Sequence, residues 1–228
     1  PYILYNRVDR TPVFFAGKGG LFAEKRQPQR FIFSLRQNGD FVMSTYSMTV
    51  AGLQRELPIC KVTDDLYIGA FICFGDAELT EACGRELLKL LEPGSYDYIF
   101  TAEAKSIPLI HEMARQSGAK KYFIARKGPK AYMPDPIHVE DQSITTAGTQ
   151  KLYLGRDDAD LIRGKRIVLM DDVISTGGSL KAMEDLVALA GGTVVARIAV
   201  LAEGDAAKRH DIRFLAPLPL FNPDGSVK

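Results

Sequence analysis

The chain has 228 residues, of which 46% are hydrophobic and 25% charged, and its formal net charge is +1. This composition is typical of a globular protein with a sizeable core plus an elaboration. It argues against a general nucleic-acid surface, and no apolar run approaches the length of a membrane span, so we expect neither nucleic acid nor membrane as a partner. The three cysteines lack metal-type spacing, which is typical of reduced thiols in a cytoplasmic protein.

The N-terminal quarter has the alternating pattern of β structure. Apolar and polar residues alternate over residues 31–43 on both sides of Asn38-Gly39, a dipeptide that strongly favours a hairpin turn. A second turn is expected at Ala51-Gly52. We therefore expect a β-rich extension or hood over residues 1–62, in which residues 1–40 could serve as an arm, a lid or a dimer contact.

Strands and helices alternate in the rest of the chain. Short apolar runs predict strands, and apolar residues at helical spacing predict helices. The predicted elements are strands at 67–74, 98–101, 122–125, 151–154, 167–170 and 194–201, helices at 79–91 (capped by Asp76), 107–116 and 180–190, and an edge strand broken by prolines within 212–221. This alternation predicts an α/β core over residues 63–228, with a parallel sheet flanked by helices on both faces.

Three predicted loops follow the carboxyl ends of core strands, the edge at which open parallel sheets bind ligands. They comprise residues 102–106, 126–132 and 171–179. The second loop brings Arg126, Lys127 and Lys130 together. Clustered cations at a strand end suit a polyphosphate, and the alternative is a solvated basic turn.

The third loop carries the most specific chemistry. Asp171 and Asp172 follow the apolar strand, and residues 175–179 (Ser-Thr-Gly-Gly-Ser) precede a helix. The N-terminus of a helix offers unpaired N–H groups, and glycines allow a phosphate to approach them closely. The two carboxylates would repel phosphate but can accept hydrogen bonds from a sugar diol. The segment therefore predicts a ribose 5-phosphate site; the alternative is an ordinary capped turn beside a surface acidic pair.

Residues 133–150 contain two prolines and little periodicity. A long irregular loop inside a compact α/β domain is usually functional, so we expect this segment to act near the site.

The run from Arg166 to Ser179 closely resembles the 5-phosphoribosyl-1-pyrophosphate (PRPP) loop of type I phosphoribosyltransferases. Residues 102–106 resemble in position the pyrophosphate loop of that family, Glu-Ala-Arg-Gly or similar in adenine phosphoribosyltransferases, with Lys105 where Arg is common. The family often has an unusual peptide bond in this loop, which we expect near Ala104-Lys105. The resemblance covers residues 64–221 and implies a type I phosphoribosyltransferase fold of the purine branch.

The resemblance also implies a role for individual residues. Asp171, Asp172 and Lys105 would be catalytic. The ribose 5-phosphate site would comprise Asp171, Asp172, Val173, Ser175, Thr176, Gly177, Gly178 and Ser179, and the pyrophosphate site Glu103, Ala104, Lys105, Ser106, Arg126, Lys127 and Lys130. Phe74 and Ile174 would contact the base, although Phe74 is equally compatible with the core.

The implied activity is transfer of ribose 5-phosphate from PRPP to a purine base, with release of pyrophosphate. Adenine is the first candidate, and xanthine, guanine and hypoxanthine follow. The implied cofactor is Mg²⁺, held mainly by PRPP and also by Asp171 or Asp172, and the implied assembly is a homodimer in the cytoplasm. The alternative is a PRPP-sensing regulator that keeps the site without turnover.

The segment 133–150 departs from the family. Adenine phosphoribosyltransferases have a Glu-Tyr pair near the position of Thr146-Ala147, and that Glu is implicated in protonating the base. No acid occupies these positions here, and the nearest acids are Glu140 and Asp141. The departure leaves the base and the proton donor open.

Overall fold

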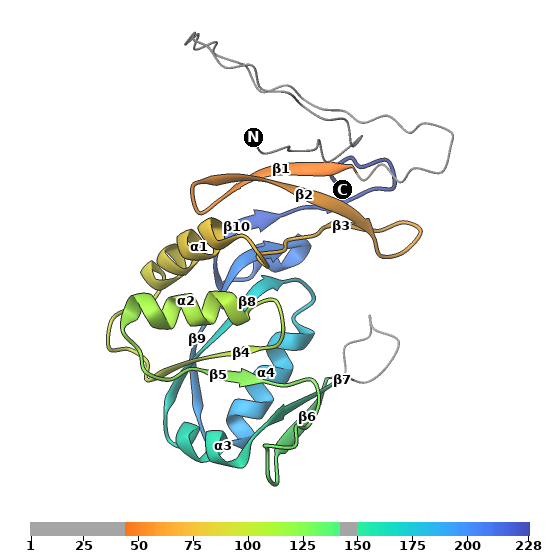
Figure 1. Cartoon of the computed structure of the whole chain (residues 1–228). Helices are drawn as coiled ribbons and strands as arrows, with labels where there is room; N and C mark the ends of the chain where they lie inside the picture. Colours follow the sequence, from red (N-terminus) through yellow and green to blue (C-terminus); the bar gives the residue numbers. More distant parts are fainter. Residues whose placement is uncertain (1–43, 142–149) are drawn as a thin grey trace, which may run out of the picture. The chain divides into compact units, whose positions relative to one another are not determined.

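The structure is a computed structural model that describes residues 44–141 and 150–228. Its central sheet has the strand order β10-β9-β8-β4-β5, and all neighbouring strands run parallel (Figure 1). The strands are β4 (Tyr98–Ala102), β5 (Phe123–Ala125), β8 (Arg166–Ile174), β9 (Thr193–Glu203) and β10 (Arg213–Leu218). The predicted parallel sheet and its edge strand are therefore confirmed.

Helices cover both faces of this sheet, as predicted. Helices α1 (Ala77–Lys89) and α2 (Ile107–Ser117) pack on one face, and α3 (Arg156–Ile162) and α4 (Gly178–Leu189) pack on the other (Figure 1). Strand β8 shows why. Its apolar residues alternate between two cores, because successive side chains of a strand point to opposite faces. Ile167 and Leu169 join the core under α3 and α4, whereas Val168 and Met170 join the core under α1 and α2.

A second, antiparallel sheet has the order β1-β2-β3-β11. Its strands are β1 (Thr45–Val50), β2 (Leu53–Lys61), β3 (Tyr67–Gly69) and β11 (Leu220–Phe221). The predicted turn at Ala51-Gly52 joins β1 to β2, and both residues have positive φ. The sheet includes strands on both sides of residue 62, where we placed the end of the extension. The predicted hairpin at Asn38-Gly39 lies outside the described residues.

Two predictions for the middle of the chain were wrong. The expected irregular segment 133–150 contains strand β6 (Ile137–Asp141), which pairs antiparallel with β7 (Gln150–Leu154). Short alternating strands such as His138-Val-Glu give a weak signal beside prolines, which explains the error. The expected strand at 67–74 is only three residues long, because pairing with β11 ends at Ile68 and pairing with β2 ends at Gly69.

Strand β8 also continues further than predicted. It runs through the two carboxylates to Ile174, because Asp171 and Val173 keep their pairing with Ala199 and Leu201 of β9. The helix after it begins at Gly178 rather than Leu180. The acidic pair therefore lies on a rigid strand instead of in a loop.

The strand order places a ligand site between β4 and β8. From β4 the chain adds β5 on one side, whereas β8, β9 and β10 extend the sheet on the other side. Such a reversal leaves a crevice at the carboxyl ends of the two central strands, where open α/β sheets bind ligands.

Candidate functional site

The loop after β8 forms one part of the site. We call residues 175–179 the β8 loop. They line a hollow of about 100 Å³ together with Asp171, Val173, Ile174 and Leu180. Gly177 caps α4 with φ 86°, a conformation that favours glycine, so the first N–H groups of the helix lie at the hollow. Unpaired N–H groups, small hydroxyls and the positive end of the helix dipole suit a phosphate.

The loop after β4 forms the other part. We call residues 102–106 the β4 loop. It lines a hollow of about 290 Å³ with Lys127, Leu152, Asp171, Asp172, Val173 and Ser179. Asp171, Val173 and Ser179 line both hollows, so the two parts of the site are continuous. The peptide bond between Glu103 and Ala104 is cis, one bond before the expected position.

The acidic pair is held by polar contacts where the two loops meet. Asp172 is 5% exposed, and its Oδ2 lies 2.5 Å from Lys105 Nζ. Asp171 is half-buried at the hollow surface. Burial, followed by the neighbouring charge of Asp172, raises the pKa of Asp171. A carboxyl with a raised pKa beside a second, buried carboxylate is typical of a functional site.

The sequence did not predict the contacts of Ser106 with the acidic pair. Its side chain is 1% exposed, and its Oγ lies 2.9 Å from Asp171 Oδ1 and 3.2 Å from Asp172 Oδ1. The hydroxyl therefore contacts the acidic pair, and contact of Ser106 with pyrophosphate stays a prediction.

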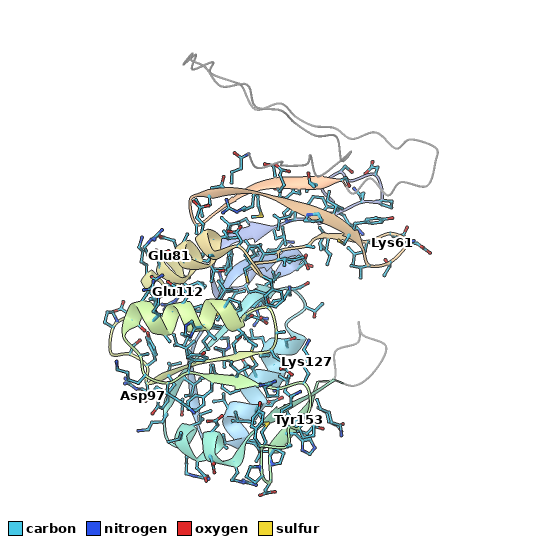
Figure 2. The ribbon with its side chains drawn as sticks, viewed as in Figure 1. Lys61, Glu81, Asp97, Glu112, Lys127 and Tyr153 are labelled. Carbon is cyan, nitrogen blue, oxygen red and sulfur yellow. The ribbon has the colours of Figure 1, made fainter. Side chains whose placement is uncertain are left out.

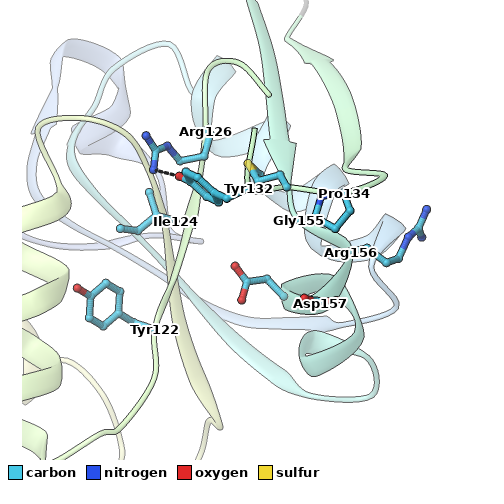
Figure 3. A pocket seen from close by; sticks show the side chains of 10 residues that line it. Tyr122, Ile124, Arg126, Tyr132, Pro134, Gly155, Arg156 and Asp157 are labelled. Carbon is cyan, nitrogen blue, oxygen red and sulfur yellow. Dashed lines mark hydrogen bonds between the residues drawn. The ribbon is translucent and has the colours of Figure 1, made fainter. Parts of the chain in front are cut away.

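The predicted cations separate into two groups. Lys105 and Lys127 line the hollow of the β4 loop, and Lys127 follows the carboxyl end of β5 (Figure 2). Arg126 instead lines another hollow of about 290 Å³ together with Tyr132 (Figure 3). Lys130 lines none of the three hollows at this edge of the sheet. The structure thus places Arg126 and Lys130 outside the hollow that Lys105 and Lys127 line, and their contact with pyrophosphate stays a prediction.

Glu103 connects Arg126 to the β4 loop. Its Oε2 lies 2.6 Å from Arg126 Nε, and its Oε1 accepts a hydrogen bond of 2.6 Å from the backbone N–H of Lys127. Arg126 also donates to the Tyr132 hydroxyl at 2.8 Å (Figure 3). Glu103 was predicted to bind pyrophosphate, but its carboxylate is engaged with these partners and would repel an anion.

The two residues assigned to the base differ in exposure. Phe74 is 51% exposed, so the alternative that it belongs to the core is wrong. Ile174 is 2% exposed and packs in the core with Leu180, although it also lines the hollow of the β8 loop. Contact of either side chain with a base stays a prediction.

Sequence reasoning missed three residues beside the site. Cys73 donates its thiol to the Lys105 carbonyl at 3.1 Å, and burial raises its pKa to about 11. Glu203 ends β9, is 7% exposed and interacts with Ser175, and burial raises its pKa. Nη1 of Arg209 lies 2.8 Å from where a Cβ of Gly177 would be. Only Glu203 had a sequence signal, because it follows a predicted parallel strand; nothing local marked Cys73 or Arg209.

Glu140 is a poor candidate for a proton donor in this structure. It lies on β6 with Lys151 Nζ at 2.9 Å, and the hydrogen bond from Lys151 lowers the pKa of Glu140. A carboxyl held in its charged form donates a proton poorly near neutral pH. Thr146-Ala147 lies outside the described residues.

The donor set fits Mg²⁺ held jointly by protein and substrate. Within residues 44–141 and 150–228, no group of three or more His, Cys, Asp or Glu side chains could enclose a metal. Mg²⁺, however, usually keeps several waters and binds through one or two carboxylates plus substrate phosphates. Asp171 and Asp172 offer such carboxylates: both line the hollow of the β4 loop, and Asp171 also lines that of the β8 loop.

A helix end suited to phosphate, two carboxylates and a lysine-bearing loop meet at a topological switch point, where open α/β sheets bind ligands. The family model of the phosphoribosyl transferase domain matches residues 77–216, which include all of these features. The chain therefore belongs to the phosphoribosyltransferase family, and its fold is the type I fold.

Relatives with names from the adenine branch agree with this assignment. An adenine phosphoribosyltransferase of Mycolicibacterium paratuberculosis is 41% identical over 97 residues, which are 42% of this chain and 50% of the relative. That of Renibacterium salmoninarum is 34% identical over 136 residues, which are 57% of this chain and 71% of the relative. The chain thus spans only about half the length of some curated relatives it matches.

A solved structure agrees as well. The adenine phosphoribosyltransferase of Thermoanaerobacter pseudethanolicus superposes with a TM-score of 0.54 at 26% identity, covering 63% of this chain and 83% of that chain.

No helix among the described residues is long and apolar enough to cross a membrane.

Proposed function

We propose that this protein transfers ribose 5-phosphate from PRPP to a purine base and releases pyrophosphate, with adenine as the first candidate. The observation that carries the proposal is the continuity of the two hollows. A phosphate hollow of about 100 Å³ and a lysine-lined hollow of about 290 Å³ share Asp171, Val173 and Ser179. PRPP has the matching order of groups: a 5-phosphate, a sugar diol and a pyrophosphate.

Each part of the site has a distinct task in this reaction. The N-terminus of α4 and the hydroxyls of the β8 loop bind the 5-phosphate, and Asp171 and Asp172 accept hydrogen bonds from the ribose hydroxyls. Lys105 and Lys127 stabilise the negative charge that develops on the leaving pyrophosphate. The two carboxylates also favour the positive charge that develops on the ribose ring.

Mg²⁺ would be held by PRPP together with Asp171 or Asp172, and would neutralise charge on the phosphate oxygens. Lys105 and Lys127 also neutralise charge on the phosphate oxygens. Both carboxylates lie on a strand, so the spacing between diol, 5-phosphate and leaving group is fixed before the substrate binds.

The Lys105–Asp172 ion pair must change when PRPP binds. At 2.5 Å, Lys105 Nζ occupies Asp172 Oδ2, which is one of the oxygens that the diol needs. Pyrophosphate offers Lys105 a more highly charged partner. Exchange of this lysine from Asp172 to pyrophosphate would free the carboxylate for the ribose in the same step.

The test is pyrophosphate release from PRPP and Mg²⁺ with a panel of adenine, hypoxanthine, guanine, xanthine, uracil and orotate. We expect release with one purine, adenine first. PRPP binding by calorimetry without release on any base would favour the alternative, a PRPP-sensing regulator. Failure to bind PRPP at all would contradict the site assignment itself.

The assembly and location follow from the same proposal. We expect a homodimer in the cytoplasm, with residues 1–62 as an extension that contributes to a hood or to the dimer contact. Analytical ultracentrifugation of the full chain and of a chain lacking residues 1–40 tests this expectation. A monomer with full turnover in both forms would contradict it.

A further inference from the structure

Ser106 makes contacts that the proposed reaction does not yet use. Its Oγ lies between the two carboxylates, 2.9 Å from Asp171 Oδ1 and 3.2 Å from Asp172 Oδ1. It also accepts a 2.9 Å hydrogen bond from the backbone N–H of Asp172. The side chain is buried at the start of α2, so one hydroxyl joins the β4 loop to the acidic pair of β8.

The number of protons on Ser106 limits what these contacts can do. A serine hydroxyl has one proton to donate, and one lone pair is already taken by the Asp172 N–H. Asp171 Oδ1 is the nearer of the two carboxylate oxygens and is therefore the better acceptor for that proton. The Asp172 N–H also lies 2.9 Å from Asp171 Oδ1, so its single proton is shared between that oxygen and Ser106 Oγ. The Ser106 hydroxyl and this shared N–H together limit the rotation of the Asp171 carboxylate.

These bonds leave a defined set of oxygens for a ligand. Asp171 Oδ2 has no hydrogen-bond donor among the described residues, while Asp171 Oδ1 has two. Asp172 Oδ1 lies beside Ser106, and Asp172 Oδ2 lies beside Lys105. Asp171 Oδ2 thus has no donor of its own within the described part of the chain, and a second oxygen, Asp172 Oδ2, becomes available when Lys105 moves.

We propose that Ser106 is a positioning residue that orients Asp171 and Asp172 toward adjacent hydroxyls, and thereby gives the site its preference for ribose over 2-deoxyribose. The proposal rests on the proposed function, because it assumes that the acidic pair binds the sugar. Ser106 acts through the carboxylates and does not touch the reacting atoms. Without its hydroxyl, the Asp171 side chain can rotate, and the paired acceptors no longer match a diol.

The chain provides a matched control for the loss of a buried hydroxyl. Thr101 on β4 is fully buried, and its Oγ1 donates to the Met170 carbonyl of β8 at 2.6 Å. It joins β4 to β8 close to Ser106, and its hydroxyl donates to a backbone carbonyl instead of to a carboxylate. Thr101→Val therefore reports on lost packing and hydrogen bonding between these strands alone.

The experiment measures the affinities of ribose 5-phosphate and 2-deoxyribose 5-phosphate by calorimetry, for the full chain and its variants. We expect the wild type to prefer ribose 5-phosphate, and Ser106→Ala to lose about tenfold of that preference, roughly the value of one net hydrogen bond. Ser106→Thr keeps the hydroxyl and should restore the preference, and Thr101→Val should retain it. Pyrophosphate affinity should stay within about twofold in all variants.

The outcomes separate this inference from the proposed function. If Ser106→Ala retains the wild-type preference, or if Thr101→Val loses as much of it, Ser106 is not a positioning residue although the proposed function stands. If the wild type binds neither sugar phosphate nor PRPP, the proposed function fails and the inference fails with it. Equal melting temperatures of Ser106→Ala and Thr101→Val would show that the two variants are comparably folded.

Discussion

The two loops at the switch point offer a ligand different kinds of atoms. The β8 loop offers mainly backbone N–H groups, small hydroxyls and a glycine cap, whereas the β4 loop offers charged side chains. The side chains of the β4 loop are already paired: Lys105 with Asp172, and Glu103 with Arg126. In the proposed reaction, the β8 loop is therefore a preorganised site for the 5-phosphate, whereas the β4 loop must exchange its ion-pair partners when pyrophosphate binds.

This difference fits the two ends of the proposed substrate. The 5-phosphate keeps its charge throughout the reaction, so a fixed set of donors is sufficient. The leaving group gains charge as the bond breaks, and only interactions that strengthen at that moment accelerate the reaction. A lysine that is released from a carboxylate toward pyrophosphate can supply such an interaction.

Asp172→Asn should have the largest effect, because Asp172 is expected to bind the ribose diol and also pairs with Lys105. The change removes the charge that Lys105 faces and one acceptor for the diol. We expect kcat/KM for PRPP to fall about 100-fold or more, since truncating one partner of a buried charge pair costs roughly 2–5 kcal/mol. Steady-state kinetics measures this. Asp185→Asn on the exposed face of α4 is the control, and unchanged kinetics in Asp172→Asn would contradict the ribose assignment.

Gly177→Ala should weaken phosphate binding at the β8 loop and lower the stability of the protein. The residue has φ 86°, and its new Cβ would lie 2.8 Å from Arg209 Nη1. We expect the free energy of unfolding to fall by about 1–2 kcal/mol. The affinity for ribose 5-phosphate should fall about 30-fold, which corresponds to the loss of one hydrogen bond to a charged group. Thermal melting and calorimetry check the two effects.

Gly164→Ala is the matched control for that change. Gly164 has φ 68°, and no heavy atom lies within 4 Å of the position that its Cβ would take, so it shares the backbone cost without the contact. The control should lose a similar stability and keep full affinity. Equal losses of affinity in the two variants would mean that the cap of α4 does not bind the phosphate.

Lys105→Gln should weaken binding at the β4 loop more selectively. We expect pyrophosphate affinity to fall about tenfold, since a hydrogen bond from a charged group contributes roughly 1.5–3 kcal/mol. The affinity for ribose 5-phosphate should change less, because Asp172 is then free of its ion pair. Lys121→Gln, at the Asp158 pair on the sheet edge, is the control. If the affinities for pyrophosphate and ribose 5-phosphate fell equally, the proposed difference between the β4 loop and the β8 loop would be wrong.

Arg126→Gln should have the smallest effect. Arg126 holds Glu103, which in turn holds the Lys127 backbone, so the change acts on the β4 loop indirectly. We expect a loss of about threefold in pyrophosphate affinity. A double-mutant cycle with Glu103→Gln measures the coupling. A loss as large as that of Lys105→Gln would instead show that Arg126 reaches the ligand.

The sequence predicted those parts of the molecule whose chemistry is local. The apolar run Ile167-Val-Leu-Met predicts a buried strand, and Ser175-Thr-Gly-Gly predicts a phosphate-binding turn, because each pattern depends on neighbours in the chain. The roles of Ser106 and Arg126 could not be predicted in this way. Each is decided by a carboxylate from a distant part of the chain, and spacing along the sequence does not show which of two nearby charges a side chain will face.

The end of strand β8 illustrates the same limit. Two adjacent aspartates suggest the end of a strand by composition, yet backbone pairing with β9 carries the strand past them. Tertiary pairing overrides the local preference, as it often does in sheets. A correct prediction required knowledge of the partner strand.

The antiparallel sheet has a consequence for the order in which the chain folds. Strand β11 (Leu220–Phe221) pairs with β3 (Tyr67–Gly69), and the backbone N–H of Lys228 bonds to the Leu220 carbonyl. Of the described strands, β11 is the last to be synthesised, whereas its partner is the third. Only Pro219 separates β11 from β10, the edge strand of the central sheet, so both sheets are completed together at the end of synthesis of the described chain. Until β11 leaves the ribosome, β3 carries an open edge that a chaperone or a second nascent chain can bind.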